Sequence, residues 1–103
     1  MWAQLMKIRV KPDKEPDLAG VFKQLQALEQ PGSGLLRTIT IRDQSDPSQV
    51  YVLVVFESEE KARAREQDPR RQEGQKSAQA GWAEIIDGPV EFVDLSVVQY
   101  VSA

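Results

Sequence analysis

The segment Val50-Tyr51-Val52-Leu53-Val54-Val55-Phe56 is the longest apolar run of the chain. Its apolar residues follow one another without alternation, as expected of a central strand that is covered on both faces. The run is far shorter than the roughly 20 apolar residues that a membrane-spanning helix needs. The sequence therefore predicts a buried strand at residues 50–56 and no association with a membrane.

Three further elements are predicted before this strand. Residues 5–11 alternate apolar and basic side chains after the first pair, which indicates a strand. Residues 16–28 begin with a proline suited to a first helical turn and are followed by the turn signals of residues 31–34, which indicates a helix. Residues 35–42 contain alternating threonine and isoleucine, whose β-branched side chains favour a second strand, and residues 43–48 are expected to form a turn.

The helix predicted at residues 16–28 is amphipathic. Its apolar residues recur at spacings of three and four, so they share one face, and its polar residues are expected to face water. The apolar face comprises Leu18, Val21, Phe22, Leu25 and Leu28, and the water-facing set comprises Lys23, Gln24, Gln26 and Glu29.

Two short helices and a last strand are predicted after residues 50–56. Ser58 can cap the first helix, and Asp68-Pro69 supplies the cap and the first turn of the second. The last strand is expected at about Val90 to Tyr100, and it carries large apolar side chains on both faces.

The predicted order βαββαβ, with the two short helices counted as one helical region, favours an α+β, ferredoxin-like fold. Such a fold has a four-stranded antiparallel sheet with helices on one face. The 103 residues are expected to form a single domain, 1–103. Because no helix is left for the other sheet face, which would expose a large apolar patch, we expect a homodimer through sheet faces. In such an interface the basic side chains must reach the rim or meet carboxylates; these are Lys7, Arg9 and Lys11, with Asp94 and Glu91 as candidate partners.

The composition excludes several classes of function. The chain contains no histidine, cysteine or asparagine, so disulfides, thiolate metal sites and histidine-dependent triads are excluded, and no metal or cofactor is expected. Its net charge of −3 argues against nucleic-acid binding. No signal peptide is apparent, and the lack of cysteine fits a cytoplasmic protein.

Four segments together resemble a known family over nearly the whole chain. They are Lys11-Pro12 after the first strand, the amphipathic helix at 18–28, the strand-to-helix passage Val54-Val55-Phe56-Glu57-Ser58, and Gly88-Pro89-Val90-Glu91-Phe92. The chain resembles the dimeric α/β barrels that include the antibiotic-biosynthesis monooxygenases and the related haem-degrading enzymes. None of these segments is a catalytic signature, and the fold hosts both enzymes and proteins without known activity.

The resemblance separates two branches of that family. Haem degradation would require an asparagine near Met6, a tryptophan near Arg65 and an iron-ligating histidine near Gln75, and none of the three is present. The antibiotic-type monooxygenases need no metal or flavin, because their substrates supply the electrons that activate oxygen. The resemblance therefore implies, for an active member, a cofactor-independent oxidoreductase whose pocket stabilises a phenolic anion with Arg, Tyr, Gln or Trp side chains.

Six residues are candidates for the wall of a ligand pocket, and no catalytic residue can be named. The two aromatic candidates on helices can equally be core residues. The arginines of the second helical region can bind an anionic ligand, but the interspersed glutamates favour a solvated helix face. Gln72, Gln75 and Gln79 suit an exposed helix or a mobile lid. The pocket candidates are Met6, Phe22, Phe56, Arg65, Gln75 and Trp82, and the arginine cluster is Arg63, Arg65, Arg70 and Arg71.

Two hypotheses on function follow. The first is a homodimer whose sheet-to-helix cleft binds a small apolar or aromatic molecule, with activity like that of the cofactor-independent monooxygenases or with ligand binding alone. The second is a structural or regulatory dimer without a small-molecule site. A cleft filled by Met6, Phe22, Phe56 and Trp82 would favour the second hypothesis.

Overall fold

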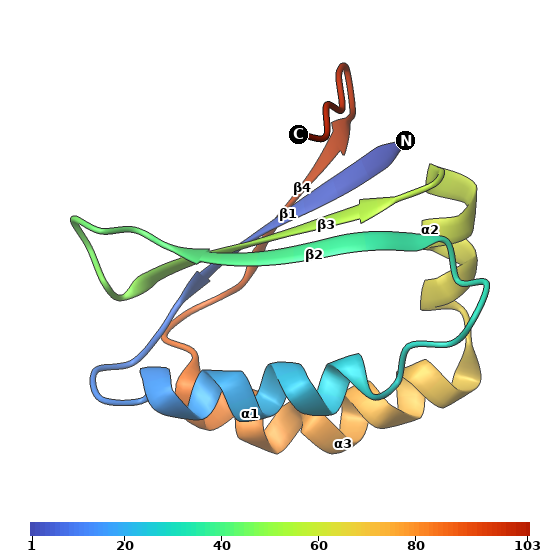
Figure 1. Ribbon diagram of the computed structural model, residues 1–103. Coiled ribbons are helices and arrows are strands. Elements are labelled where there is room, and N and C mark those ends of the chain that lie inside the picture. Colours follow the sequence, from blue (N-terminus) through green and yellow to red (C-terminus); the bar gives the residue numbers. More distant parts are fainter.

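Four antiparallel strands form one sheet in the computed structural model, which describes residues 1–103, and two long helices lie against one face of that sheet (Figure 1). The strands follow the order β2-β3-β1-β4 across the sheet, which is the order of a ferredoxin-like fold. The predicted α+β fold class is therefore confirmed. The elements are β1 (Trp2–Arg9), α1 (Glu15–Gln26), β2 (Leu35–Arg42), β3 (Gln49–Phe56), α2 (Glu59–Glu66), α3 (Pro69–Ile85) and β4 (Glu91–Ser96).

Local sequence explains where the helices begin. The Ser58 side chain accepts a hydrogen bond from the Lys61 backbone N–H at 3.2 Å, and the Asp68 side chain accepts one from the Arg70 N–H at 2.9 Å. These two caps start α2 and α3 at the predicted residues. The turn after α1 needs Gly34, whose φ is +86° and whose missing Cβ would lie 2.7 Å from Cβ of Lys61.

The main core lies between the two long helices and the centre of the sheet. Ile8 is completely buried, and it belongs to a cluster that draws side chains from β1, β3, α1 and α3. A second, smaller cluster joins Trp2, Phe56 and Ala62 near α2. The main cluster consists of Ile8, Val10, Leu18, Val21, Val50, Val52 and Ile85.

Several predicted boundaries were wrong; the helix expected at residues 16–28, for example, ends at Gln26. The first strand begins at Trp2 rather than Leu5, because Trp2 pairs with Phe56 on one side and Ser96 on the other. The last strand ends at Ser96 rather than Tyr100, because its ladder with β1 ends at the pair of Trp2 and Ser96 and only one longer backbone hydrogen bond, from Val97 to Met1 at 3.4 Å, follows. The second helical region contains one helix of 8 residues and one of 17, not two short ones, since the polar face of α3 concealed its length.

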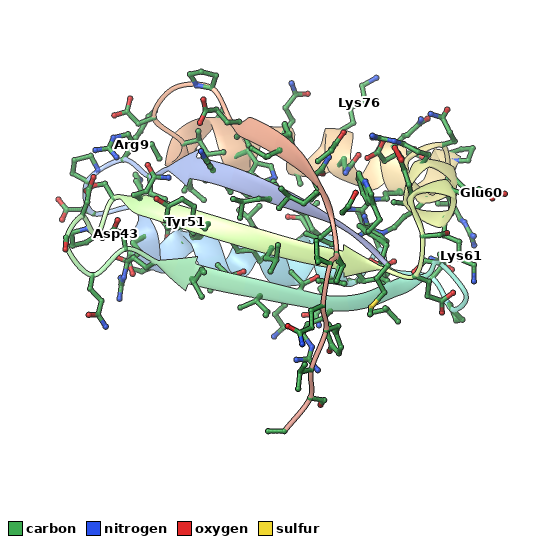
Figure 2. All side chains as sticks on the ribbon, turned by 90° about the horizontal axis from the view of Figure 1, so that it is seen from above. Arg9, Asp43, Tyr51, Glu60, Lys61 and Lys76 are labelled. Atoms are coloured by element: carbon green, nitrogen blue, oxygen red, sulfur yellow. The ribbon has the colours of Figure 1, made fainter.

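The register of the sheet separates its two faces. Met6 aligns with Val52 and Phe92 on the face toward the helices, and Leu5 aligns with Leu53 and Val93 on the opposite face, here called the outer face. Figure 2 looks down on this outer face, with Tyr51 upon it and Arg9 at its end. The segment after β4 crosses over the outer face and passes beyond β2 (Figure 2).

The outer face keeps large apolar side chains in contact with water. Ile39 is 38% exposed, Ile41 51% and Leu95 37%. β3 itself is better covered on this face, since Val55 is 5% exposed and Tyr51 and Leu53 are intermediate, so the exposed apolar side chains of the outer face belong to β2 and β4. None of the helices is both long enough and apolar enough to cross a membrane.

Two of the three basic residues predicted on the first strand lie near one end of the outer face, whereas Lys11 lies beyond β1 and donates to the Ala83 carbonyl oxygen at 3.2 Å. Arg9 pairs with Asp46 at 2.9 Å, and Lys7 lies beside Glu91 in the register of β1 and β4. Asp94, the other expected partner, lies on the helix side of β4, where it accepts hydrogen bonds from Gln4 and Arg63 at 3.0 and 2.8 Å. These hydrogen bonds hold the pKa of Asp94 below its ordinary value.

Candidate functional site

A cleft of about 950 Å³ lies between the helix-facing side of the sheet and the helices. Half of its 24 lining residues are hydrophobic, and the rest supply mainly amide, hydroxyl and guanidinium groups. Its volume is at the upper end of the range for clefts that bind small organic molecules. The strands form its ceiling with Met6, Val52, Val54 and Phe92, and α1 and α3 form its floor.

One end of the cleft is apolar and aromatic. Phe22 of α1 and Trp82 of α3 meet edge to face, with ring centroids 5.4 Å apart. Both rings also pack against the main core while remaining partly exposed to the cleft. They therefore form a wall of the cleft without filling it.

The other end of the cleft is charged. Arg65 of α2 donates to both carboxylate oxygens of Glu29, with Nε–Oε2 2.9 Å and Nη2–Oε1 2.6 Å. Its guanidinium also lies 5.1 Å from the ring centroid of Phe56. Arg71 of α3 approaches the same carboxylate from the other side. We call Glu29, Arg65 and Arg71 the ion cluster.

The ion cluster is largely withdrawn from water. The exposed fractions of the side chains are 14% for Arg65, 12% for Arg71 and 21% for Glu29. Burial opposes ionisation of Glu29, but the hydrogen bonds from Arg65 and Ser33 and the charge of Arg71 together outweigh it, so the pKa of Glu29 lies below its ordinary value. Burial and then the neighbouring Arg65 charge lower the pKa of Arg71.

Glutamines replace apolar residues along the cleft-facing side of α3. Gln72, Gln75 and Gln79 recur at spacings of three and four, so they share one face of the helix, and that face lines the cleft. Thr38 and Thr40 of β2 also line the cleft. A ligand between β2 and α3 would therefore meet hydrogen-bond donors and acceptors on both sides.

All six pocket candidates from the sequence line this one cleft. Their role in binding a ligand stays a prediction, but the structure brings together residues from β1, α1, β3, α2 and α3 that are far apart in the chain. The six residues are Met6, Phe22, Phe56, Arg65, Gln75 and Trp82.

Two expectations about polar residues were wrong. Glu29 does not face water, because the turn after α1 brings it against Arg65. The arginines do not all form a solvated face: Arg63 and Arg70 are exposed, but Arg65 and Arg71 are not. Arg65 and Arg71 are buried because each lies on the side of its helix that faces Glu29, just beyond the end of α1. Arg63 and Arg70 lie on other sides of the same helices.

Several lining residues were not recognised from the sequence. Thr38 and Thr40 alternate with Ile39 and Ile41, and this period shows two faces without showing which one turns inward. Phe92 lies beside Met6 only through the pairing of β1 with β4, and Gln4 shares the face of Met6 because it lies two residues earlier on β1. The three-and-four spacing of the α3 glutamines was the one local signal of a polar cleft wall.

The side chains of the cleft suit binding better than metal chemistry. No cluster of three or more histidine, cysteine, aspartate or glutamate residues could hold a metal ion. The chain contains no histidine, so the cleft does not fit a histidine-ligated haem. The arrangement can hold an apolar body between aromatic side chains and bind polar groups at its charged end.

Comparison with known proteins gives one family and a consistent fold. The family described as "Antibiotic biosynthesis monooxygenase" matches residues 1–77. No curated protein sequence matches the chain.

Solved structures of similar fold cover nearly the whole chain. A candidate antibiotic biosynthesis monooxygenase from Nitrosomonas europaea is 16% identical, with a TM-score of 0.74 and coverage of 96% of this chain and 100% of that one. A protein from Caulobacter crescentus, described in the same words, is 19% identical, with a TM-score of 0.76 and coverage of 95% and 90%. The protein Rv0793 from Mycobacterium tuberculosis is 13% identical, with a TM-score of 0.72 and coverage of 98% of both chains. At these identities the similarity shows the fold alone.

Proposed function

The chain belongs to the antibiotic biosynthesis monooxygenase family, and from this premise we propose that its cleft binds a small, largely apolar or aromatic molecule. The observation that carries the proposal is the cleft of about 950 Å³, which has an aromatic end and a charged end. A monomer core would normally fill such a space with side chains, because protein interiors pack closely. The glutamines of α3 leave it open, and they suit a ligand with carbonyl or hydroxyl groups.

The reaction that we propose to test is the oxidation of a bound phenol to a quinone by molecular oxygen. A ring carbon loses its hydrogen and gains a carbonyl oxygen, the phenol loses its O–H proton, and the second oxygen atom leaves as water. The substrate supplies the electrons, so the reaction needs no redox cofactor. Arg65, Arg71 and the glutamines of α3 are cleft groups suited to stabilising the phenolate.

We also propose that the protein is a homodimer in which the outer faces of two sheets pack together. The apolar side chains exposed on that face support this, since their burial against water is favourable. Arg9 lies at the end of the face and pairs with Asp46, and Lys7 lies beside Glu91, so neither charge obstructs such an interface.

Two measurements test these proposals. Native mass spectrometry of the purified protein reports the assembly together with any retained ligand, and the expected species is a dimer of the 11.6 kDa chain with an added small mass. Oxygen consumption is then measured with a panel of phenols and hydroquinones. Uptake of oxygen by none of them would contradict the enzymatic form of the proposal.

A variant in the aromatic end supplies the control for activity. Trp82→Leu keeps an apolar side chain but removes the edge-to-face contact with Phe22. We expect this contact, worth about 0.5–1.5 kcal/mol, to be lost together with part of the binding surface, so oxygen uptake should need more substrate. An unliganded dimer without oxygen uptake would favour a structural or regulatory role.

A further inference from the structure

The charged end of the cleft has an excess of positive charge. Arg65 occupies both carboxylate oxygens of Glu29, and Nη1 of Arg71 remains 4.0 Å from Oε1, beyond hydrogen-bond distance. The other nearby carboxylates are Glu66, which is half exposed and lies 3.7 Å from Arg63, and Asp68, which pairs with Arg70. Two guanidinium groups thus share one carboxylate, and one positive charge has no counter-ion of its own.

Arg71 is the member of the ion cluster that lacks partners. Its side chain is 12% exposed, and its Nε and Nη1 atoms are buried without a hydrogen-bond acceptor. An unpaired buried donor is unfavourable, and more so when the group carries a charge. The exposed Arg70, one residue earlier, has Asp68 as its partner, so the deficit is specific to Arg71.

Arg71, which lacks a counter-ion and hydrogen-bond acceptors, lies where a ligand could supply them. Arg71 and Arg65 line the large cleft and also a second cavity of about 270 Å³, so the ion cluster is a wall between two spaces. Arg71 and Trp82 are eleven residues apart on α3, which corresponds to about 16 Å along the helix. Gln75 and Gln79 lie between them on the cleft side.

We propose that the cleft recognises an organic monoanion, with its charged head beside Arg71 and Arg65 and its apolar or aromatic body directed toward Phe22 and Trp82. This inference rests on the ligand-binding function proposed above and adds the charge of the ligand to it. The anion supplies the counter-ion that the ion cluster lacks. Carboxylate is a well-matched head, because a charge-assisted hydrogen bond from guanidinium to carboxylate is short and strong.

Matched charged and neutral probes test this assignment. Isothermal titration calorimetry compares 6-phenylhexanoate with 6-phenylhexanamide, which has the same body and an uncharged head. We expect the carboxylate to bind the wild-type protein about tenfold more tightly or better, as one charge-assisted hydrogen bond predicts. Arg71→Gln should abolish this preference, and Arg71→Lys should retain part of it.

Arg70→Gln is the control variant, because it removes the same charge from an adjacent, exposed residue. It should keep the wild-type preference, which excludes a general effect of net charge, and circular dichroism checks that each variant is folded. Equal binding of the two probes to the wild type would overturn the anionic head while leaving the binding cleft intact. A preference unchanged in Arg71→Gln would also overturn it, and binding of neither probe would count against both proposals.

Discussion

At the scale of single residues, Glu29 links the fold to the cleft. It follows the end of α1 and receives two hydrogen bonds from Arg65, which belongs to α2, so it joins segments that are 36 residues apart. Its low exposure makes this pair more important than the exposed ion pairs of the surface, which typically contribute little. Without its charge, Arg65 and Arg71 would be two neighbouring cations with no carboxylate between them.

Replacing Glu29 by glutamine should therefore destabilise the protein. We expect a loss of about 1–3 kcal/mol in the free energy of unfolding at neutral pH, because the largely buried Arg65 loses its charged acceptor and Arg71 loses a neighbouring negative charge. Urea denaturation measures this loss. The matched control is Glu66→Gln on α2, whose exposed side chain should change stability by less than about 0.5 kcal/mol.

The effect of Glu29 should also depend on pH in a defined direction. The pKa of Glu29 is lowered in the folded protein, so its contribution is fully present above the ordinary glutamate pKa of about 4.3 and is lost as the pH falls through the lower folded value. The difference in unfolding free energy between wild type and Glu29→Gln should shrink in acid. A difference that persists at about pH 2 would show that the carboxylate charge is not its source.

At the scale of elements, the packing of α1 against α3 determines the width of the cleft floor. Gly74 of α3 lies close to Leu28, two residues beyond the end of α1: a Cβ there would be 2.9 Å from Cγ of Leu28 and closer still to its terminal carbons. Gly20, within α1, has no heavy atom within 4 Å of an added Cβ. The missing side chain of glycine therefore permits close packing at Gly74, whereas at Gly20 no neighbour is close enough to require it.

These two glycines predict opposite results for the same substitution. Gly20→Ala should stabilise the protein by about 0.5–1 kcal/mol, because alanine lowers the entropy of the unfolded chain and meets no neighbour. Gly74→Ala has the same helical benefit but must displace Leu28, so its unfolding free energy should be lower than that of Gly20→Ala by about 1 kcal/mol or more. Equal stabilisation in thermal unfolding would mean that Leu28 moves aside freely.

At the scale of the whole molecule, the two faces of the sheet have different roles. In β2, Thr38 and Thr40 point toward the cleft, and Ile39 and Ile41 point to the outer face. A strand at the surface of a monomer would normally place its polar side chains in water and its apolar side chains inside. This orientation is explained if the cleft holds a ligand with polar groups and the outer face meets a second chain. The crossing segment after β4 lies over the same face, where Tyr100 approaches the Arg37 guanidinium.

A charge on the outer face should separate the proposed dimer. Ile39→Lys places one lysine from each chain in a two-fold interface, where burying the charge is costly, so light scattering after size exclusion should give the mass of one 11.6 kDa chain. Thr38→Lys puts the same charge on the neighbouring residue but on the cleft side, and should leave the dimer intact. A dimer in both variants would place the interface elsewhere, and a monomeric wild type would contradict the proposal.

The sequence by itself determined the kinds of elements, their order and the excluded chemistries. These follow from local properties: the unbroken apolar run of β3, the three-and-four spacing of α1, the caps at Ser58 and Asp68, and a composition without histidine or cysteine. It also indicated six residues that line one cleft, because the order of the elements predicts the fold and the fold determines which faces of the strands and helices meet.

Only the tertiary structure decided which faces meet and which charges are buried. The alternation of threonine and isoleucine in β2 is equally compatible with either face turned inward, and pairing with β3 settles it. The pairing of Glu29 with Arg65, and the isolation of Arg71, depend on segments distant in the chain that pack together. No local period encodes such a contact, because it arises from the packing of three helices whose ends converge at the charged end of the cleft.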